Sequence, residues 1–339
     1  MAMLEVKDLQ THFFTASGVV KAVNGVSFNL EEGKVLGIVG ESGSGKSVTA
    51  YSILQILTHP GRIVGGSIKF RGKELVGIGE DEMRKIRGNK ISIIFQDPMT
   101  SLNPVLTIGN QLIEAILLHT DRNKTEARAR AIEMLAKVGI NEPEKRLKQY
   151  AYELSGGMRQ RVMIAMALAC EPDILIADEP TTALDVTIQA QILELMKELQ
   201  KESGMAIIMI THDLGVIAGM CDEVIVMYAG RIAERGTADA IFYSPKHEYT
   251  KGLMRSIPNI DEDEKNRLIP ITGTPIDLLN LPKGCAFAPR CDKAMKICLE
   301  QRPDEYWVGC DHLASCWINV KDGNIIEDPS RAKEEMQHE

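Results

Sequence analysis

One stretch constrains the fold of this chain more than any other: residues 35–50 read VLGIVGESGSGKSVTA. The apolar start predicts a buried strand, and the rest fits G-x-x-x-x-G-K-[ST], in which a glycine-rich loop joins a strand to a helix. Glycines let loop N–H groups approach an anion, and the helix adds its positive N-terminal end. Lys46 can then reach the β- and γ-phosphates of a nucleotide, and the Ser47 hydroxyl can ligate Mg²⁺. The alternative is a chance glycine-rich turn, which the flanking strand and apolar helix disfavour.

Length and composition limit the class of protein. A chain of 339 residues can form one large domain with an appendage, or two domains. The net charge of −8 argues against nucleic acid as a partner. The first ten residues lack a basic stretch ahead of an apolar core, so no secretory signal is expected. The longest apolar run, residues 162–170, is too short to span a bilayer, so membrane association would require a partner protein.

Strand-like and helix-like patterns alternate along the chain. Residues 3–32 alternate apolar and polar side chains, with a turn at 16–18, which predicts two half-buried strands. Residues 108–152 have helical periodicity, which predicts a helical insert. The alternation predicts an α/β fold with a mostly parallel sheet, whose carboxyl-terminal strand ends carry the ligand site. Further strands are expected at 67–71, 91–95, 174–177, 206–210 and 224–227, and a helix at 187–201.

Two further motifs point to phosphate chemistry. Residues 174–179 read ILIADE, a strand ending in two carboxylates, of which Asp178 is predicted to hold Mg²⁺ and Glu179 to polarise a water at the γ-phosphate. Two solvated acids at a strand end are the alternative. Residues 154–161 read LSGGMRQR, in which Ser155 and two glycines open a helix and form a second anion-binding N-terminus. Two phosphate cradles in one chain indicate either two sites or one site shared between two chains.

These motifs together resemble those of the ATPase subunits of ABC transporters. The resemblance covers residues 3–240 and includes Gln96 in FQDP, ALD at 183–185 and His212 in ITHD. It implies a P-loop NTPase fold of the ABC type, with a mostly parallel sheet core, an antiparallel β subdomain and a helical subdomain at about 100–160. In that family two ATPase domains close head to tail on two ATPs, and the signature helix of each faces the phosphate loop of the other.

The resemblance also implies catalytic roles. Glu179 would be the general base, and His212 would hold the γ-phosphate and orient the water. Gln96 would contact Mg²⁺ and couple to the membrane subunit. A lone histidine or glutamine would be unremarkable, and only the accompanying motifs favour function here. The implied Mg²⁺ ligands are Ser47, Gln96 and Asp178.

The remaining implied contacts concern the nucleotide and the second chain. Ser155 and Gly157 would contact the γ-phosphate bound by the partner, and Asp185 would cross the dimer interface. Adenine would stack on Phe13, with Phe14 as the rival and an ordinary core phenylalanine as the alternative. The nucleotide contacts implied within one chain are Phe13, Gly40, Ser42, Gly43, Ser44, Gly45, Lys46, Ser47 and Val48.

Cysteines are concentrated near the C-terminus, where five of the seven lie in residues 285–316. A reducing compartment is expected, so they indicate metal ligation before disulfides. Residues 247–253 (HEYTKGL) and 271–291 (ITGTPIDLLNLPKGCAFAPRC) resemble the C-terminal region of oligopeptide/dipeptide importer ATPases, some of which carry a [4Fe–4S] cluster on such cysteines. Zinc is the alternative, metal-free thiols come third, and Cys310 could replace Cys316. The expected cluster ligands are Cys285, Cys291, Cys298 and Cys316.

We therefore expect three parts: an ABC ATP-binding domain in 1–240, a linker or wrapping segment in 241–283, and a cysteine-rich iron–sulfur module with a polar tail in 284–339. The predicted function is the ATP-hydrolysing subunit of a dipeptide or oligopeptide importer. It would be peripheral, at the cytoplasmic face of the cell membrane.

The expected partners are two transmembrane permease subunits, a second homologous ATPase chain and, indirectly, an extracytoplasmic peptide-binding protein. A homodimer is the alternative to the second chain. The alternative functions are a nickel or other small-solute importer of the same subfamily, a non-transport ABC ATPase, and a metal-cluster sensor that only binds nucleotide. A non-transport protein would usually carry two cassettes or a long coiled-coil insertion, and neither is found in the sequence.

Overall fold

The computed structural model describes residues 2–181, 186–256 and 270–320. They form two compact units in which distant parts of the chain combine. Unit 1 contains the residues up to Glu5, Asn29–Val35 and Lys69–Ile210. Unit 2 contains Val6–Phe28, Leu36–Ile68 and the residues from Thr211 onward, so the C-terminal region belongs to the same unit as the phosphate loop. The division at 240 and 283 expected from the sequence stays a prediction.

Unit 1 contains three neighbouring parallel strands, β6 (Ile91–Ile94), β7 (Ile174–Asp178) and β8 (Ala206–Ile210), with β7 in the middle. Every residue of β7 and β8 is buried. This is why these strands are continuously apolar, since parallel strands are covered on both faces. The run ends in Asp178, which is fully buried, so the alternative of a solvated acid at the strand end does not apply to this residue.

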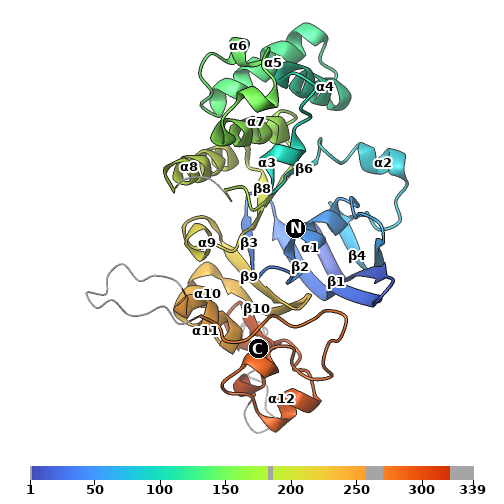
Figure 1. The fold of residues 1–339 in the computed structure, drawn as a ribbon, viewed down its shortest axis with the longest axis vertical. Helices are drawn as coiled ribbons and strands as arrows, with labels where there is room; N and C mark the ends of the chain where they lie inside the picture. Colours follow the sequence, from blue (N-terminus) through green and yellow to red (C-terminus); the bar gives the residue numbers. More distant parts are fainter. Residues whose placement is uncertain (1, 182–185, 257–269, 321–339) are drawn as a thin grey trace, which may run out of the picture. The chain divides into compact units, whose positions relative to one another are not determined.

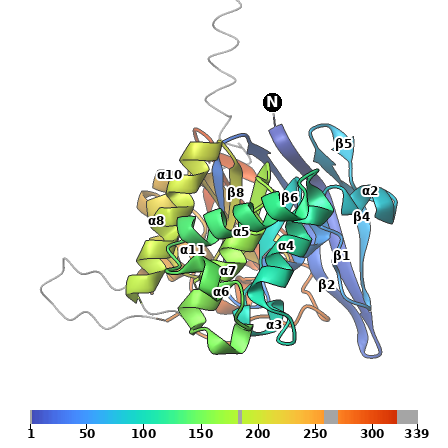
Figure 2. The same ribbon diagram turned by 90° about the horizontal axis from the view of Figure 1, so that it is seen from above.

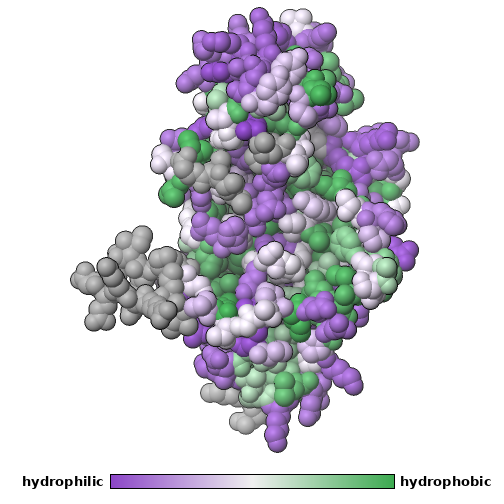
Figure 3. All heavy atoms as spheres, viewed as in Figure 1, coloured by the Kyte–Doolittle hydropathy of each residue, from purple (hydrophilic) through white to green (hydrophobic). Residues whose placement is uncertain are grey.

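The helical insert predicted from the sequence is confirmed in unit 1, and its helices lie close together in Figure 1. The face of the insert seen in Figure 3 is mostly hydrophilic. Asn123 and Glu126 form a capping box that fixes the start of α5 (Lys124–Lys137). The other helices of unit 1 are α2 (Glu80–Arg84), α3 (Pro98–Ser101), α4 (Ile108–His119), α6 (Pro143–Arg146), η1 (Ala151–Glu153), α7 (Gly156–Leu168) and α8 (Val186–Ser203).

Unit 2 contains the strand that leads to the phosphate loop. β3 (Val35–Val39) pairs in parallel with β9 (Glu223–Tyr228), and β9 pairs antiparallel with β10 (Arg231–Thr237). Two strands from the cysteine-rich region then extend this sheet: β12 (His312–Ala314) pairs with β10, and β11 (Tyr306–Gly309) pairs with β12. The cysteine-rich region is therefore joined to unit 2 by backbone pairing.

A second sheet has the order β2-β1-β4-β5, and its three long strands lie side by side in Figure 2. The strands are β1 (Ala2–Thr15), β2 (Gly18–Glu31), β4 (Gly61–Phe70) and β5 (Lys73–Glu74), so the turn expected at 16–18 is confirmed. None of the helices in the described ranges combines the length and apolar character needed to cross a membrane. The helices of unit 2 are α1 (Lys46–Ile53), α9 (Leu214–Met220), α10 (Ala238–Tyr243), α11 (Glu248–Arg255), η2 (Ala288–Arg290), α12 (Lys296–Glu300) and η3 (Trp317–Asn319).

Candidate nucleotide site

The glycine-rich loop connects β3 to α1, as the sequence predicts. At two positions its own surroundings demand glycine. A Cβ at Gly40 would lie 2.2 Å from the backbone oxygen of Met227, and a Cβ at Gly45 would lie 2.4 Å from that of Ala22. Both glycines also have positive φ, 152° and 104°. The loop is therefore held against β2 and β9 more closely than any side chain would permit.

Lys46 and Ser44 are buried polar side chains of this loop. Lys46 is 6% exposed, and its Nζ donates to the carbonyl oxygens of Gly40 at 2.7 Å and Glu41 at 3.0 Å. Ser44 is buried, and its Oγ has no hydrogen-bond partner among the residues that the structure describes. A buried ammonium and a buried hydroxyl fit an anionic ligand, because phosphate oxygens accept charge-assisted hydrogen bonds from an ammonium and hydrogen bonds from a hydroxyl.

A cavity of about 300 Å³ adjoins this loop within unit 2. Residues 41–44 line it together with 275–278, Val20, Tyr228 and Ala229. The segment 275–278 lies in the ITGTPIDLL sequence, which the sequence analysis assigned to a linker. Phe13 does not line this cavity; it is half-buried in β1, where its ring packs against Gly61. The adenine contact assigned to Phe13 stays a prediction.

Unit 1 brings Gln96 and Glu179 together. Glu179 follows β7 with φ 48° and donates its backbone N–H to Ile210 at 2.8 Å. Its Oε2 accepts a hydrogen bond from Gln96 Nε2, also at 2.8 Å. A non-glycine residue with positive φ is strained, and such strain is concentrated at functional sites. The turn and the amide together fix the direction of the Glu179 carboxylate.

The predicted Mg²⁺ ligands are a hydroxyl, an amide and a carboxylate, which are oxygen donors of the kind that Mg²⁺ prefers. Asp178 ends β7 fully buried, while Ser47 lies in the first turn of α1. Mg²⁺ is usually held by one or two carboxylates plus substrate phosphates, so a single aspartate suffices on the protein side. The residues present therefore fit Mg²⁺ delivered with a nucleotide.

Residues 154–161 (LSGGMRQR) contain the helix N-terminus that the sequence predicts. Ser155 Oγ accepts the N–H of Met158 at 3.3 Å and caps α7. Ser155 and Gly156 are exposed, and a Cβ at Gly156 would meet no described atom within 4 Å. Packing among the described residues thus gives no reason for glycine at Gly156. His212, which follows β8, is also exposed, and Asp185 lies outside the described residues.

Four cysteines of unit 2 lie close enough for their charges to influence one another. Burial raises the pKa of Cys285, Cys291 and Cys316, the last to about 11, and the charge of at least one other cysteine of the set raises each further. Backbone N–H groups that donate hydrogen bonds to these three sulfurs oppose this effect and lower the pKa of each thiol. Cys298 Sγ accepts the N–H of Met295 at 3.5 Å. Each of the four sulfurs therefore accepts at least one backbone hydrogen bond.

The other cysteines differ. Cys310 is exposed, with its Sγ 3.8 Å from Asp311 Oδ2. Cys170 Sγ donates to the carbonyl oxygen of Ala115, and burial raises the pKa of Cys221 to about 12. In the described part of the chain, no group of three or more histidine, cysteine, aspartate or glutamate side chains is arranged to hold a metal ion. The metal centre expected on the four neighbouring cysteines of unit 2 therefore stays a prediction.

Comparison with known proteins identifies the family to which this chain belongs. Residues 23–182 match the ABC transporter family, and residues 233–298 match the oligopeptide/dipeptide transporter C-terminal region. The chain is 53% identical over 336 residues to the oligopeptide transport ATP-binding protein OppD of Bacillus subtilis, covering 99% of this chain and 94% of that protein. It is 54% identical to the dipeptide transport ATP-binding protein DppD of the same organism, covering 93% of this chain and 94% of that protein.

A solved structure extends the comparison to the fold. A dimeric ATP-binding cassette, MJ0796, in a post-hydrolysis state bound to ADP and Pi, superposes with a TM-score of 0.64 at 29% identity. The match covers 70% of this chain and 99% of that one. The predicted P-loop fold of the ABC type is confirmed, with mixed α/β sheets. The chain belongs to the ATP-binding subunits of ABC transporters, in the branch that carries the oligopeptide/dipeptide transporter C-terminal region.

Proposed function

We propose that this protein hydrolyses ATP to power the import of dipeptides or oligopeptides through partner membrane subunits. The observation that carries the proposal is the similarity to peptide-transport ATP-binding proteins over nearly the whole chain, C-terminal region included. Because no described helix can cross a membrane, the pathway would be formed by two permease subunits. The protein would bind them at the cytoplasmic face, and a peptide-binding protein would deliver the cargo outside.

Hydrolysis would centre on Glu179. Its carboxylate would take the proton of the water that attacks the γ-phosphate, while the Gln96 amide keeps it aimed. Bound Mg²⁺, held by Ser47, Gln96 and Asp178, would neutralise charge on the β- and γ-phosphates. His212 would hold the γ-phosphate and orient the water.

The nucleotide site would be shared between two chains. Gly156 is exposed beside Ser155, with open space where a side chain would lie, so the requirement for glycine would come from an ATP held by a partner. Ser155 and Gly157 would contact that ATP, and Asp185 would cross the interface. The partner would be a homologous ATPase chain or a second copy of this one. ATP would then hold the two chains together, and hydrolysis would release them.

The substitution Glu179→Gln tests the catalytic assignment, since it keeps the shape of the side chain and removes the base. We expect ATP turnover to fall about 100-fold or more, with ATP binding retained. Glu202→Gln is the matched control, because Glu202 is an exposed residue of α8 whose ion pair with Lys137 is 4.0 Å long. Turnover at the wild-type rate in Glu179→Gln would show that another group is the base.

Cargo is tested in cells that lack the gene. Uptake of labelled dipeptides and oligopeptides should return with the wild-type protein but not with Glu179→Gln. Restored uptake of nickel without peptide uptake would instead favour the small-solute importer. ATP turnover that is accompanied by uptake of neither solute would favour a non-transport ABC ATPase.

We further propose that Cys285, Cys291, Cys298 and Cys316 hold a [4Fe–4S] cluster. Burial raises the pKa of Cys285, Cys291 and Cys316, and hydrogen bonds donated to the sulfurs would offset part of that effect and support thiolates once iron is bound, as in iron–sulfur sites. A zinc ion needs its ligands to converge at about 2.3 Å, whereas a cluster binds each cysteine to a different iron. Iron and sulfide analysis of anaerobically purified protein tests this, and zinc without iron would refute it.

A further inference from the structure

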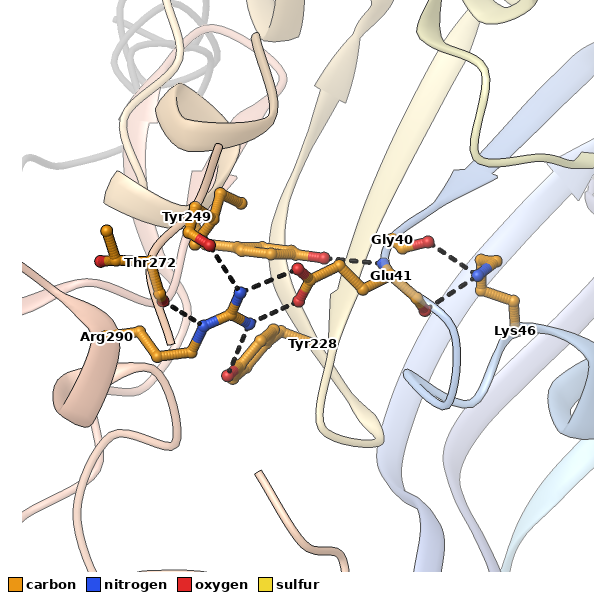
Figure 4. Close-up of polar contacts among 8 residues, drawn as sticks. Gly40, Glu41, Lys46, Tyr228, Tyr249, Thr272 and Arg290 are labelled. Carbon is orange, nitrogen blue, oxygen red and sulfur yellow. Dashed lines mark hydrogen bonds and ion pairs between the residues drawn. The ribbon is translucent and has the colours of Figure 1, made fainter. Parts of the chain in front are cut away.

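The second residue of the phosphate loop, Glu41, is held through three groups: its carboxylate, its backbone N–H and its backbone carbonyl (Figure 4). Its carboxylate accepts two hydrogen bonds from Arg290, at 2.6 Å and 2.9 Å. Its backbone N–H donates to the Tyr249 hydroxyl at 2.8 Å, and its carbonyl accepts Lys46 Nζ at 3.0 Å. The G-x-x-x-x-G-K-[ST] pattern leaves this position free. The phosphate-loop pattern therefore does not explain the glutamate, whereas its carboxylate contacts with Arg290 do.

The Arg290 side chain is almost fully buried, with 5% of it exposed, and the Glu41 side chain is 25% exposed. Arg290 Nε donates to the carbonyl of Thr272 at 2.9 Å, and Nη1 lies 3.4 Å from the Tyr228 hydroxyl. A buried charge is tolerated only when it is paired and hydrogen-bonded, and a bidentate carboxylate is its strongest partner. The pair is thus a fixed joint, unlike an exposed ion pair, which contributes little.

Arg290, the cationic member of this pair, lies in the cysteine-rich region. Arg290 ends η2, directly before Cys291, and its backbone N–H donates to Phe287 at 2.9 Å. The Phe287 ring packs against Tyr228 and Tyr249, with centroids 5.4 Å apart in both cases. The fold between the cysteines therefore sets where the guanidinium lies.

We propose that Arg290 is a positioning residue for ATP binding: it holds the phosphate loop through Glu41 and thereby couples the cysteine-rich region to the nucleotide site. The coupling is reciprocal, so ATP must stabilise this region by the same factor by which the region strengthens ATP binding. The inference rests on the nucleotide site of the family and is independent of which metal the cysteines hold.

Arg290→Gln in the full chain tests the proposal. We expect the Kd and KM for Mg-ATP to rise about tenfold, a typical coupling, while kcat at saturating ATP stays near the wild-type value. Arg290→Lys should restore part of the affinity, because it keeps the charge but not the fork of donors. Glu305→Gln is the matched control, since it breaks the 3.0 Å pair with Arg235 elsewhere in the same region and should leave the Kd unchanged.

Two further measurements keep the test decisive if Arg290→Gln folds poorly. Glu41→Gln and the double variant complete a mutant cycle, and the double variant leaves no unpaired charge. The effects on Kd should be strongly non-additive, and additive effects would refute the joint. In the wild type, Mg-ATP should slow hydrogen exchange in residues 287–291, and Glu41→Gln should abolish that effect. Unchanged exchange in a wild-type protein that binds ATP would overturn the coupling and leave the transport proposal intact.

Discussion

Acid should weaken the attachment of α11, and a single histidine accounts for a calculable part of that effect. His247 is 4% exposed and caps α11 by accepting the Tyr249 N–H on Nδ1 at 3.0 Å. Burial lowers the pKa of His247 from 6.5 to about 4, against the opposing charges of Glu234 and Glu248. The neutral ring is therefore the form that fits the folded state.

The sign and size follow from proton linkage. In the unfolded chain His247 takes up a proton near pH 6.5, whereas in the folded chain it stays neutral until the pH approaches 4. The contribution of His247 to the free energy of unfolding is therefore fully present above pH 6.5 and is lost as the pH falls toward 4. Integration of that difference gives a loss of about 2 kcal/mol at pH 5 and about 3 kcal/mol below pH 4. The loss concerns the helix that carries Tyr249, whose hydroxyl accepts the N–H of Glu41 in the phosphate loop.

His247→Asn isolates this contribution, because asparagine caps a helix well but does not titrate. The opening free energy of α11 can be measured by hydrogen exchange at pH 7.5 and pH 5, corrected for intrinsic rates. The wild type should lose about 2 kcal/mol more than the variant between these two values. The pKa of Glu234, which burial raises but hydrogen bonds from His312 and backbone groups lower overall, affects both proteins and largely cancels. Equal losses would refute the buried neutral histidine.

Two other outcomes are expected. Cys316→Ser should lose most of the iron, whereas Cys310→Ser should keep it, as measured by metal analysis after anaerobic purification; iron loss in Cys310→Ser alone would exchange the two assignments. Ser155→Ala should keep ATP binding to the separate chain but reduce ATP-dependent dimerisation, measured by size exclusion in a Glu179→Gln background; undiminished dimerisation would contradict the shared site.

The local parts of the nucleotide site could be predicted from the sequence because their geometry is local. The strand, loop and helix at 35–50 are contiguous, and Ser155 caps α7 through an atom three residues away. Glycine at Gly40 and Gly45 is required by the close approach of the loop to neighbouring backbone. Such positions leave a mark in the sequence whatever the tertiary arrangement.

The Gln96–Glu179 contact could not be predicted in the same way. These residues are 83 positions apart, and nothing in either motif names the other as its partner. The sequence analysis predicted that Gln96 contacts Mg²⁺ and couples to the membrane subunit. The structure adds a direct hydrogen bond from Gln96 to Glu179, the predicted base. Polar pairing between strand ends depends on sheet register, which periodicity alone does not specify.

The Glu41–Arg290 joint shows why the C-terminal region was underestimated from its composition. Its prolines and lost periodicity predicted a linker with a small metal module, because loop-rich sequence carries little packing information. Yet Arg290 lies 249 positions from Glu41, and it is the burial of this pair that gives the region a connection to the phosphate loop. A metal alone would account for the cysteines, but it would not require a buried arginine beside one of them to reach a carboxylate in the nucleotide site. The burial of that charge against Glu41 is better explained if the region acts on ATP binding as well as folding around its own cysteines.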